Sequence, residues 1–193
     1  MGKRTKETIT LGSGKLYSVE YTGTIPSNSD LEKEENILGY IKGGASLDYK
    51  PEYYDAEDDL GMVKKTILTK EEVTLKSGIL TWNANTLKKL VSTGRITEDE
   101  ENNMRTIKIG GINNNDGKQY IFHFVHEDKK DGNVRITIVG QNTAGFSLAF
   151  AKDAETVIDA EIKALPNDSE GTLIIFQEEY TPSDSDGETD PSV

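Results

Sequence analysis

The sequence has no cysteine, few histidines and no long apolar run. The absence of cysteine excludes disulfides, zinc-thiolate centres and thiol nucleophiles. No run of about 18 apolar residues occurs, and no apolar segment follows the basic residues near the start. We therefore expect neither a membrane-spanning helix nor a conventional export signal, and a chain that is made as a soluble protein.

Basic residues are also in short supply. The chain has 22 lysines and arginines against 34 aspartates and glutamates, which gives a formal net charge of -12. This balance favours solubility and argues against a surface that coats nucleic acid or an anionic membrane.

With 193 residues, 34% of them hydrophobic, the chain is long enough for one well-buried globular domain. We expect this domain to span residues 1–179, and the Pro-, Ser- and acid-rich residues 180–193 to form a disordered tail.

Alternating apolar and polar residues in the middle of the chain indicate an antiparallel β-meander. Its three strands are predicted at Arg105–Gly111, Lys118–Glu127 and Asn133–Gly140. Asp116-Gly117 and Asp131-Gly132 have the composition of the tight turns that join neighbouring antiparallel strands. The sequence therefore predicts a mainly antiparallel β architecture.

Similar patterns predict further strands on both sides of this meander. They lie at Glu7–Leu11, Lys15–Thr22, Ile37–Lys50, Val63–Leu68, Glu71–Leu80, Ile158–Ala164 and Thr172–Glu178. Gly43-Gly44 interrupts one of them and marks a bulge or bend, whereas Thr24–Asn36 and Ile96–Asn103 have the composition of loops. The strands at Tyr120–Val125 and Thr172–Glu178 carry apolar residues on both faces. We expect a second sheet, a helix or a neighbouring subunit to cover both sides of these two strands.

One segment departs from the β pattern and predicts a short helix over about residues 84–92. Leu87 and Leu90 share a face at helical spacing, and Asn83 or Asn85 can cap the first turn. Because so short a helix is unstable alone, we expect its apolar face to pack on a sheet.

No group of residues has the spacing of a catalytic, phosphate-binding or metal site. His123 and His126 are the only histidines, and residues three apart on a strand point to opposite faces, so these two cannot share a metal. Asn113–Gly117 does not fit a calcium loop, and Gly12–Lys15 lacks the Ser or Thr that completes a phosphate loop. The carboxylates of Glu52–Asp59 lie along an extended segment and converge poorly on a divalent ion. We therefore assign no metal and no cofactor.

Several segments together resemble a known family of structural proteins. The similarity is carried by Ile37–Ala45 (ILGYIKGGA), Leu80–Asn83, Gly140–Phe146, Leu148–Phe150, Ala164–Pro166 and Gly171–Ile175. With these segments the chain, over roughly Thr8 to Glu179, resembles the tail tube proteins (major tail proteins) of long-tailed siphophages and prophages of low-GC Gram-positive bacteria. None of the segments is a catalytic motif, and the match rests on their overall pattern.

The resemblance implies an antiparallel β-sandwich or flattened barrel with one short flanking helix. It further implies hexameric rings that stack into a hollow tube through which the genome leaves. The partners would be other copies of this chain, the tail tape-measure protein and the tail-terminator or tip proteins, while DNA would pass without specific binding. The protein would be assembled in the cytoplasm of the bacterial host and reside in the virion tail, with no membrane and no enzymatic activity involved.

The family uses long loops and a projecting hairpin for contacts between rings, and by position these are Thr24–Asn36 and the Tyr53–Val73 region. The implied contact residues are Pro26, Ser27, Asn28, Asp30 and Glu32 in the loop, and Tyr53, Tyr54, Asp58 and Asp59 in the hairpin. The inner wall of a DNA conduit should be net negative, because each inward Lys or Arg would bind a phosphate. Candidates for this wall are Glu52, Asp55, Glu57, Asp159 and Glu161.

A carbohydrate-binding β-sandwich module is the main alternative, with Trp82, Tyr53 and Tyr54 as an aromatic platform. The place of Trp82 just before the predicted helix favours a core anchor instead. An enzyme is the third class, and the sequence offers it no identifiable nucleophile or base.

Overall fold

The computed structural model describes residues 13–180 and is mainly β, with 49% strand and 10% helix. The predicted class, a mainly antiparallel β fold with few helices, is confirmed. The strand predicted at Glu7–Leu11 and the tail predicted beyond Tyr180 lie outside the described residues.

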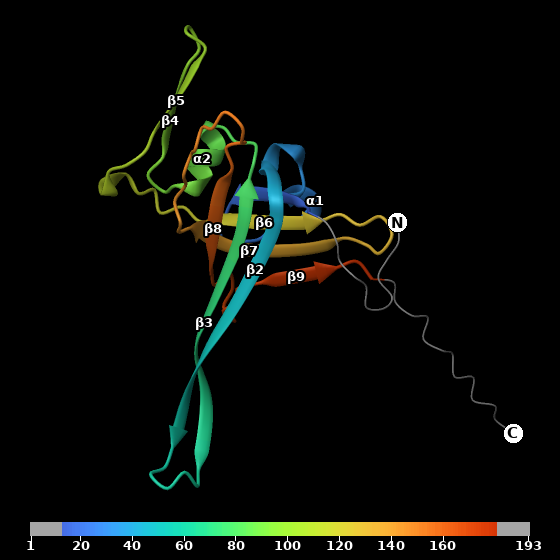
Figure 1. The fold of residues 1–193 in the computed structure, drawn as a ribbon, viewed down its shortest axis with the longest axis vertical. Coiled ribbons are helices and arrows are strands. Elements are labelled where there is room, and N and C mark those ends of the chain that lie inside the picture. The colour runs from blue at the N-terminus through green and yellow to red at the C-terminus, as the bar shows by residue number, and fades with distance from the viewer. Residues whose placement is uncertain (1–12, 181–193) are drawn as a thin grey trace, which may run out of the picture.

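Six strands pair into a closed antiparallel ring, which we call the barrel (Figure 1). In ring order these are β6 (Tyr120–His126), β1 (Lys15–Glu20), β2 (Ile37–Glu57), β3 (Lys64–Ile79), β8 (Ile158–Leu165) and β7 (Val134–Asn142). The ring closes because β7 pairs again with β6. A seventh strand, β9 (Ile175–Glu178), pairs with the first part of β7. Closure removes free strand edges from the barrel itself.

The inward faces of the strands build the barrel core. Along β8 the side chains alternate between buried and more exposed positions, and the buried set joins the main core cluster: Ile158, Ala160, Ile162 and Ala164. The half-buried strand predicted at Ile158–Ala164 is therefore confirmed.

Strand β6 is buried along its whole length, as its apolar residues on both faces predict. Phe122 and Phe124 belong to the barrel core. Ile121 lies on the other face and forms a second cluster with Val139 and Leu31. The second side of β6 is therefore covered by a segment of the same chain, the one that contains Leu31.

That segment was predicted as an irregular loop at Thr24–Asn36, and this expectation is wrong in part. It contains a short helix, α1 (Asn28–Leu31), and a 3-10 turn, η1 (Glu34–Asn36). Leu31 is only 1% exposed and anchors the segment against the barrel, while the side-chain amide of Asn36 donates to two carbonyls of α1. Burial of the Leu31 side chain therefore holds in place a segment whose polar composition predicts an irregular loop.

The predicted helix is present as α2 (Ala84–Leu90). The Asn83 side chain accepts hydrogen bonds from two backbone N–H groups of the first turn, at 2.8 and 3.2 Å, and so caps the helix. Leu87 and Leu90 are buried in the barrel core, as the spacing of the apolar residues predicts.

Strands β2 and β3 form one long hairpin, with 21 residues in β2 and 16 in β3. The two strands predicted at Val63–Leu68 and Glu71–Leu80 are therefore a single strand, which is a correction. Two register shifts keep the ladder continuous: Gly43-Gly44 form the predicted bulge, and Thr69 is an extra residue in β3. The two bulge glycines have φ of 83° and 81°, a region that favours glycine.

The first strand of the predicted meander pairs elsewhere. β5 (Met104–Lys108) overlaps the predicted strand Arg105–Gly111, yet it forms a separate hairpin with β4 (Arg95–Asp99) and does not pair with β6. The loop predicted at Ile96–Asn103 is accordingly wrong over β4. The second hairpin of the meander, β6–β7, is confirmed.

Local polar contacts explain why this charged stretch forms a hairpin. Arg105 Nε lies 2.7 Å from Glu98 Oε1 across the two strands. At the turn Asp99 accepts hydrogen bonds from the backbone and side-chain N–H groups of Asn102, and Asn103 has φ of 51°. These contacts tie the charged residues into a turn, whereas their composition alone predicts a solvated loop.

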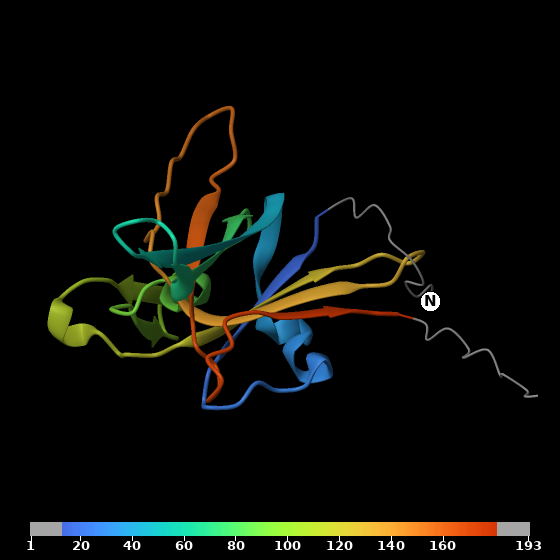
Figure 2. The same cartoon turned by 90° about the horizontal axis from the view of Figure 1, so that it is seen from below.

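The long β2–β3 hairpin and the β4–β5 hairpin leave the barrel in opposite directions along the longest axis of the molecule (Figure 1). Figure 2 shows the segment between β7 and β8 (residues 143–157, orange) as a large loop on one side of the barrel and α1 (blue) on the other. The molecule is thus a barrel with extensions at both ends.

Strand β9 is the exposed exception among the predicted strands. Thr172–Glu178 is predicted to be covered on both sides, yet no element of residues 13–180 covers Phe176, which is 58% exposed. Of the predicted covers, a neighbouring subunit is the one that stays a prediction. Within residues 13–180, β9 has β7 as its only strand neighbour. The apolar residues just before it, Leu173 and Ile174, pack against the core instead.

Candidate functional site

Beyond the barrel the β2–β3 hairpin continues as a two-stranded ribbon, which we call the arm (residues 51–70). β1 pairs with β2 only at residues 37–40, and β8 pairs with β3 only at residues 74–79. Within the described chain, the two strands of the arm therefore pair only with each other. Both outer edges of the arm present backbone N–H and C=O groups to which another strand can add.

Large apolar side chains are exposed along the arm. At its tip Leu60 is 80% exposed and Met62 is 81% exposed. Five more large apolar residues of the arm are at least 44% exposed: Tyr53, Tyr54, Val63, Ile67 and Leu68. An isolated two-stranded ribbon is marginal in water, and exposed apolar side chains gathered on one element mark an interaction surface. The arm therefore has the properties of a segment that is completed by a partner.

Ion pairs across the arm use acidic residues that the sequence singles out for a lumen. Asp55 lies 2.8 Å from Lys64 and accepts a hydrogen bond from the Thr66 hydroxyl at 2.6 Å. These two partners hold the pKa of the Asp55 carboxyl below its ordinary value. Glu52 pairs with Lys70 at 3.2 Å. Two of the predicted lumen carboxylates are therefore balanced by lysines of the opposite strand.

The hairpin contact residues predicted from the sequence all lie on the arm. Asp58 Oδ1 accepts a hydrogen bond from the backbone N–H of Val63 at 2.7 Å, which closes the turn and lowers the pKa of this carboxyl. Asp59 is exposed in the same turn. Tyr53 and Tyr54 are consecutive on β2 and so lie on opposite faces of the ribbon.

The remaining predicted lumen residues lie at two places. Asp159 and Glu161 alternate with buried residues of β8 and face outward from the barrel, whereas Glu57 ends β2 near the arm tip. Lys76 on β3 lies 3.4 Å from Glu161 and 3.7 Å from Asp48 on β2. Among residues 13–180, Glu57 and Asp159 form no ion pair.

The outer face of β2, β3 and β8 continues this alternation of charge toward the arm. Glu72 lies 2.8 Å from Lys70 and 3.1 Å from Lys163, and these two ammonium groups lower the pKa of Glu72 to about 2. On this outer face carboxylates and lysines therefore alternate, and most carboxylates have a lysine neighbour. Such a face offers few free cations to a phosphate backbone.

Two groups of exposed apolar residues lie outside the contact residues predicted from the sequence. Leu60 and Met62 lie in the predicted hairpin region Tyr53–Val73 but are not among its predicted contact residues, although two large apolar residues beside a glycine in a polar stretch are themselves a signal. On the β4–β5 side, Ile112 is 92% exposed, and Met104 and Ile109 are exposed nearby in the chain. Each of the two projecting ends therefore carries apolar groups.

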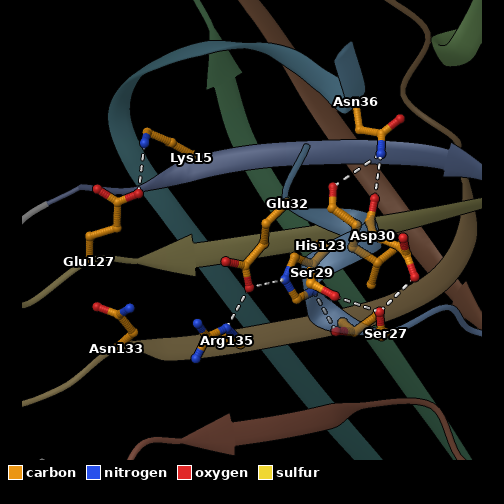
Figure 3. A network of polar contacts seen from close by, with 12 residues as sticks. Lys15, Ser27, Ser29, Asp30, Glu32, Asn36, His123, Glu127, Asn133 and Arg135 are labelled. Carbon is orange, nitrogen blue, oxygen red and sulfur yellow. Dashed lines mark hydrogen bonds and ion pairs between the residues drawn. The ribbon is translucent and has the colours of Figure 1, made fainter. Parts of the chain in front are cut away.

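The predicted contact loop lies against the outside of the barrel (Figure 3). Pro26 and Ser27 are exposed, Asn28 begins α1, and the Ser27 hydroxyl donates to Asp30 Oδ2 at 2.7 Å. Glu32 differs from these residues, because its carboxylate is engaged with barrel side chains. Pro26, Ser27 and Asp30 are thus exposed, whereas Asn28 and Glu32 are half-buried.

Glu32 joins a partly buried network that the sequence did not indicate (Figure 3). Its Oε1 accepts from Arg135 Nε at 2.5 Å and lies 3.4 Å from His123 Nε2. His123 Nδ1 lies 2.7 Å from the Thr137 hydroxyl. Burial lowers the pKa of His123, and this effect outweighs the opposite influence of Glu32, so the imidazole is neutral at physiological pH.

The aromatic platform of the alternative hypothesis does not form. Trp82 packs against the core as predicted, its Nε1–H donates to the Thr156 carbonyl at 3.3 Å, and its ring centroid lies 6.4 Å from that of Phe150. Tyr53 and Tyr54 lie on opposite faces of the arm. The three aromatic residues therefore share no surface.

No protein-family model matches the chain, and a search of curated proteins finds no match either. Among residues 13–180, no group of three His, Asp or Glu side chains could hold a metal ion, and no helix is long and apolar enough to cross a membrane. The prominent features of this surface are the exposed arm and the opposite β4–β5 hairpin, both suited to binding another protein.

Proposed function

We propose that this chain is a structural subunit of a bacteriophage tail tube, which forms hexameric rings that stack into a hollow conduit for DNA. The observation that carries the proposal is the arm, a ribbon that extends beyond a closed barrel, exposes apolar side chains and has two edges that no other strand of residues 13–180 pairs with. The proposal agrees with the family resemblance of the sequence and with the mainly β class of the fold.

The geometry supports head-to-tail association of copies. The arm and the β4–β5 hairpin project in opposite directions, so different surfaces of two copies can meet along the long axis (Figure 1). Contacts between two different surfaces generate rings or open-ended stacks, whereas one self-complementary surface closes as a dimer. Because the barrel is closed, strand addition between copies would use the edges of the arm or of β9.

Charge supports a conduit that does not retain DNA. The arm has five carboxylates and three lysines, and the whole chain has a net charge of -12. Lys64 and Lys76 already neighbour carboxylates. They therefore neutralise DNA phosphates less, and displace fewer of the counterions bound to DNA, than free lysines would. In the proposed tail the tape-measure protein and DNA occupy the lumen, and the terminator or tip proteins bind the tube ends.

Electron microscopy of the concentrated full-length protein tests this function, together with sedimentation at increasing concentration. We expect rings or tubes. A protein that stays monomeric at high concentration, or closes as a dimer, would refute the proposal, and glycan binding by such a monomer would favour the carbohydrate-binding alternative.

A matched pair of variants tests the role of the arm in the same assay. Met62→Ser at the arm tip should reduce assembly, while Phe150→Ser, which alters a residue of similar exposure (79%) on the 143–157 loop, should leave it unchanged. Met62→Ser should leave the melting temperature of the dilute protein unchanged, whereas Phe150→Ser should lower it slightly, because it removes the ring contact with Trp82. Equal assembly of the two variants would show that the arm tip is not a contact.

A further inference from the structure

We infer that one ion-pair network couples the segment around α1 (residues 27–36) to the C-terminal strand β9, so that the two are held on the barrel together or released together. Arg135 on β7 is the shared residue. Its Nε donates to Glu32 of the α1 segment, and its Nη1 donates to Glu179 Oε1, directly after β9, at 2.9 Å. One guanidinium therefore joins two segments that are far apart in the sequence.

The network is shielded enough from water to matter energetically. The Arg135 side chain is 13% exposed, and those of Glu32 and Glu179 are each 26% exposed. Pairs at such positions are screened less than pairs on the open surface, and removal of one partner leaves a partly buried charge without compensation. His123 contacts Glu32 through Nε2 and is held by the Thr137 hydroxyl at Nδ1. The Glu32 carboxylate is therefore held in place beside Arg135.

Both segments are otherwise lightly attached. The α1 segment has one fully buried apolar anchor, Leu31. β9 has four residues, pairs on one side only within the described chain, and leaves Phe176 exposed. Glu179 also accepts hydrogen bonds from the backbone and side-chain N–H groups of Asn133. Loss of the Arg135 contacts should therefore weaken the attachment of either segment to the barrel considerably.

Release of the two segments would uncover different parts of the barrel wall. β9 lies against β7 at residues 134–137, a stretch that β8 does not reach, because β8 pairs with β7 at residues 139–142. The α1 segment covers Ile121 and Val139 from outside. In a tube, the C-terminal strand would thereby control the loop predicted to contact the next ring. That consequence rests on the proposed function, whereas the coupling does not.

Residue-resolved hydrogen exchange on the dilute, monomeric full-length protein tests the coupling. The reporters in the α1 segment are the hydrogen-bonded backbone amides of Leu31, Glu32 and Asn36. The β9 reporters are the amides of residues 175–178 that pair with β7. Glu179→Gln should speed exchange in β9 and, through Arg135, should also speed exchange of the α1 reporters by about fivefold or more. Amides of β6 should keep their protection and show that the barrel is intact.

Glu178→Gln is the matched control, because Glu178 is exposed and, within the described residues, forms no ion pair. This variant should leave the α1 reporters unchanged. Thermodynamic coupling is reciprocal, so Glu32→Gln should speed exchange of the β9 amides, and the double variant should show less than the product of the two single effects.

The inference is overturned if Glu179→Gln loosens β9 while the α1 reporters exchange as in the parent protein. Should Glu179→Gln fail to fold, Glu32→Gln with the β9 reporters decides alone. Dilution prevents assembly, so a negative result leaves the tube proposal untouched, and a chain that never forms tubes can still show the coupling.

Discussion

The two halves of strand β3 carry the same kind of backbone ladder but opposite side-chain environments. Residues 72–79 alternate between buried and partly buried positions in the barrel wall, whereas residues 64–70 on the arm are all exposed. β2 accompanies both halves. The difference shows that pairing with a neighbouring strand and burial in a core are separate conditions, and that the arm meets only the first.

The energies of the two halves differ accordingly. Full burial of a leucine or valine such as Leu75 or Val73 stabilises a protein by about 1.5–3 kcal/mol. An exposed ion pair of the arm, such as Glu52 with Lys70, is screened by water and contributes far less. The barrel half is therefore stable within the monomer, and the arm half gains most from contacts with a partner.

The largest expected effect separates two leucines on this one strand. Leu75→Ala should lower the free energy of unfolding by about 2–5 kcal/mol, because it leaves a cavity in the core. Leu68→Ala on the arm should change it by less than about 0.5 kcal/mol. Denaturant unfolding of the dilute protein measures both. Equal losses would show that the arm packs in the monomer and would break the comparison.

Two glycines sharpen the comparison through sterics. A Cβ at Gly39 would lie 2.2 Å from the Thr81 carbonyl oxygen, so Gly39→Ala should cost about 1–3 kcal/mol, as overpacking does. Gly61 at the arm tip has φ of 67° and no heavy atom within 4 Å of such a Cβ. Gly61→Ala strains only the local turn, so the melting temperature should fall for Gly39→Ala and hold for Gly61→Ala. A fall of similar size in both would place the arm tip in the cooperative unit.

Acidification should produce the smallest effect and should affect the arm before the barrel. The pKa values of Asp55 and Asp58 lie below the ordinary value of 3.8, owing to Lys64 and to the Val63 N–H group respectively. A carboxyl with a depressed folded pKa contributes stability that is present above the unfolded pKa and is lost as the pH falls through the folded pKa. We expect amide protection in the arm to decrease below about pH 4, while that of β6 persists.

The control for this titration is Asp55→Asn, which removes one of the two carboxyls and the Lys64 ion pair. Its arm should exchange faster than the parent's at neutral pH and lose less protection on acidification. Arm protection that stays constant until the barrel itself unfolds would show that these contacts do not hold the ribbon together.

Sequence reasoning succeeded where the signal was local. The alternation of Ile158–Ala164 predicted β8, and the apolar faces of Tyr120–Val125 predicted a doubly covered β6. Asn83 and Asn85 were the two predicted caps of α2, and Asn83 is the cap. Gly43-Gly44 predicted the bulge in β2. In each case the physical cause, side-chain periodicity or a backbone conformation that favours a residue type, acts within a few residues.

Sequence reasoning could not predict pairings between residues that are far apart in the chain. Arg105–Gly111 has the pattern of a strand, but the pattern does not say that β4 rather than β6 is its neighbour. The ion pair of Asp55 with Lys64 follows only from the register of the long hairpin, and the lumen position of Asp55 stays a prediction. The pairing of Glu32 with Arg135 requires α1 to fold against β7, and the role of Glu32 in a contact between rings stays a prediction.

The sequence by itself determined the β class, the position of the helix, the bulge, the acidic balance and the absence of cysteine chemistry, because these follow from composition and short-range periodicity. Tertiary structure decided the closed ring, the continuity of β3 into the arm, the exposure of β9 and the network around Arg135. Strand pairing and burial depend on which distant residues compete for the same edge or face. That competition is settled only when the whole chain is packed.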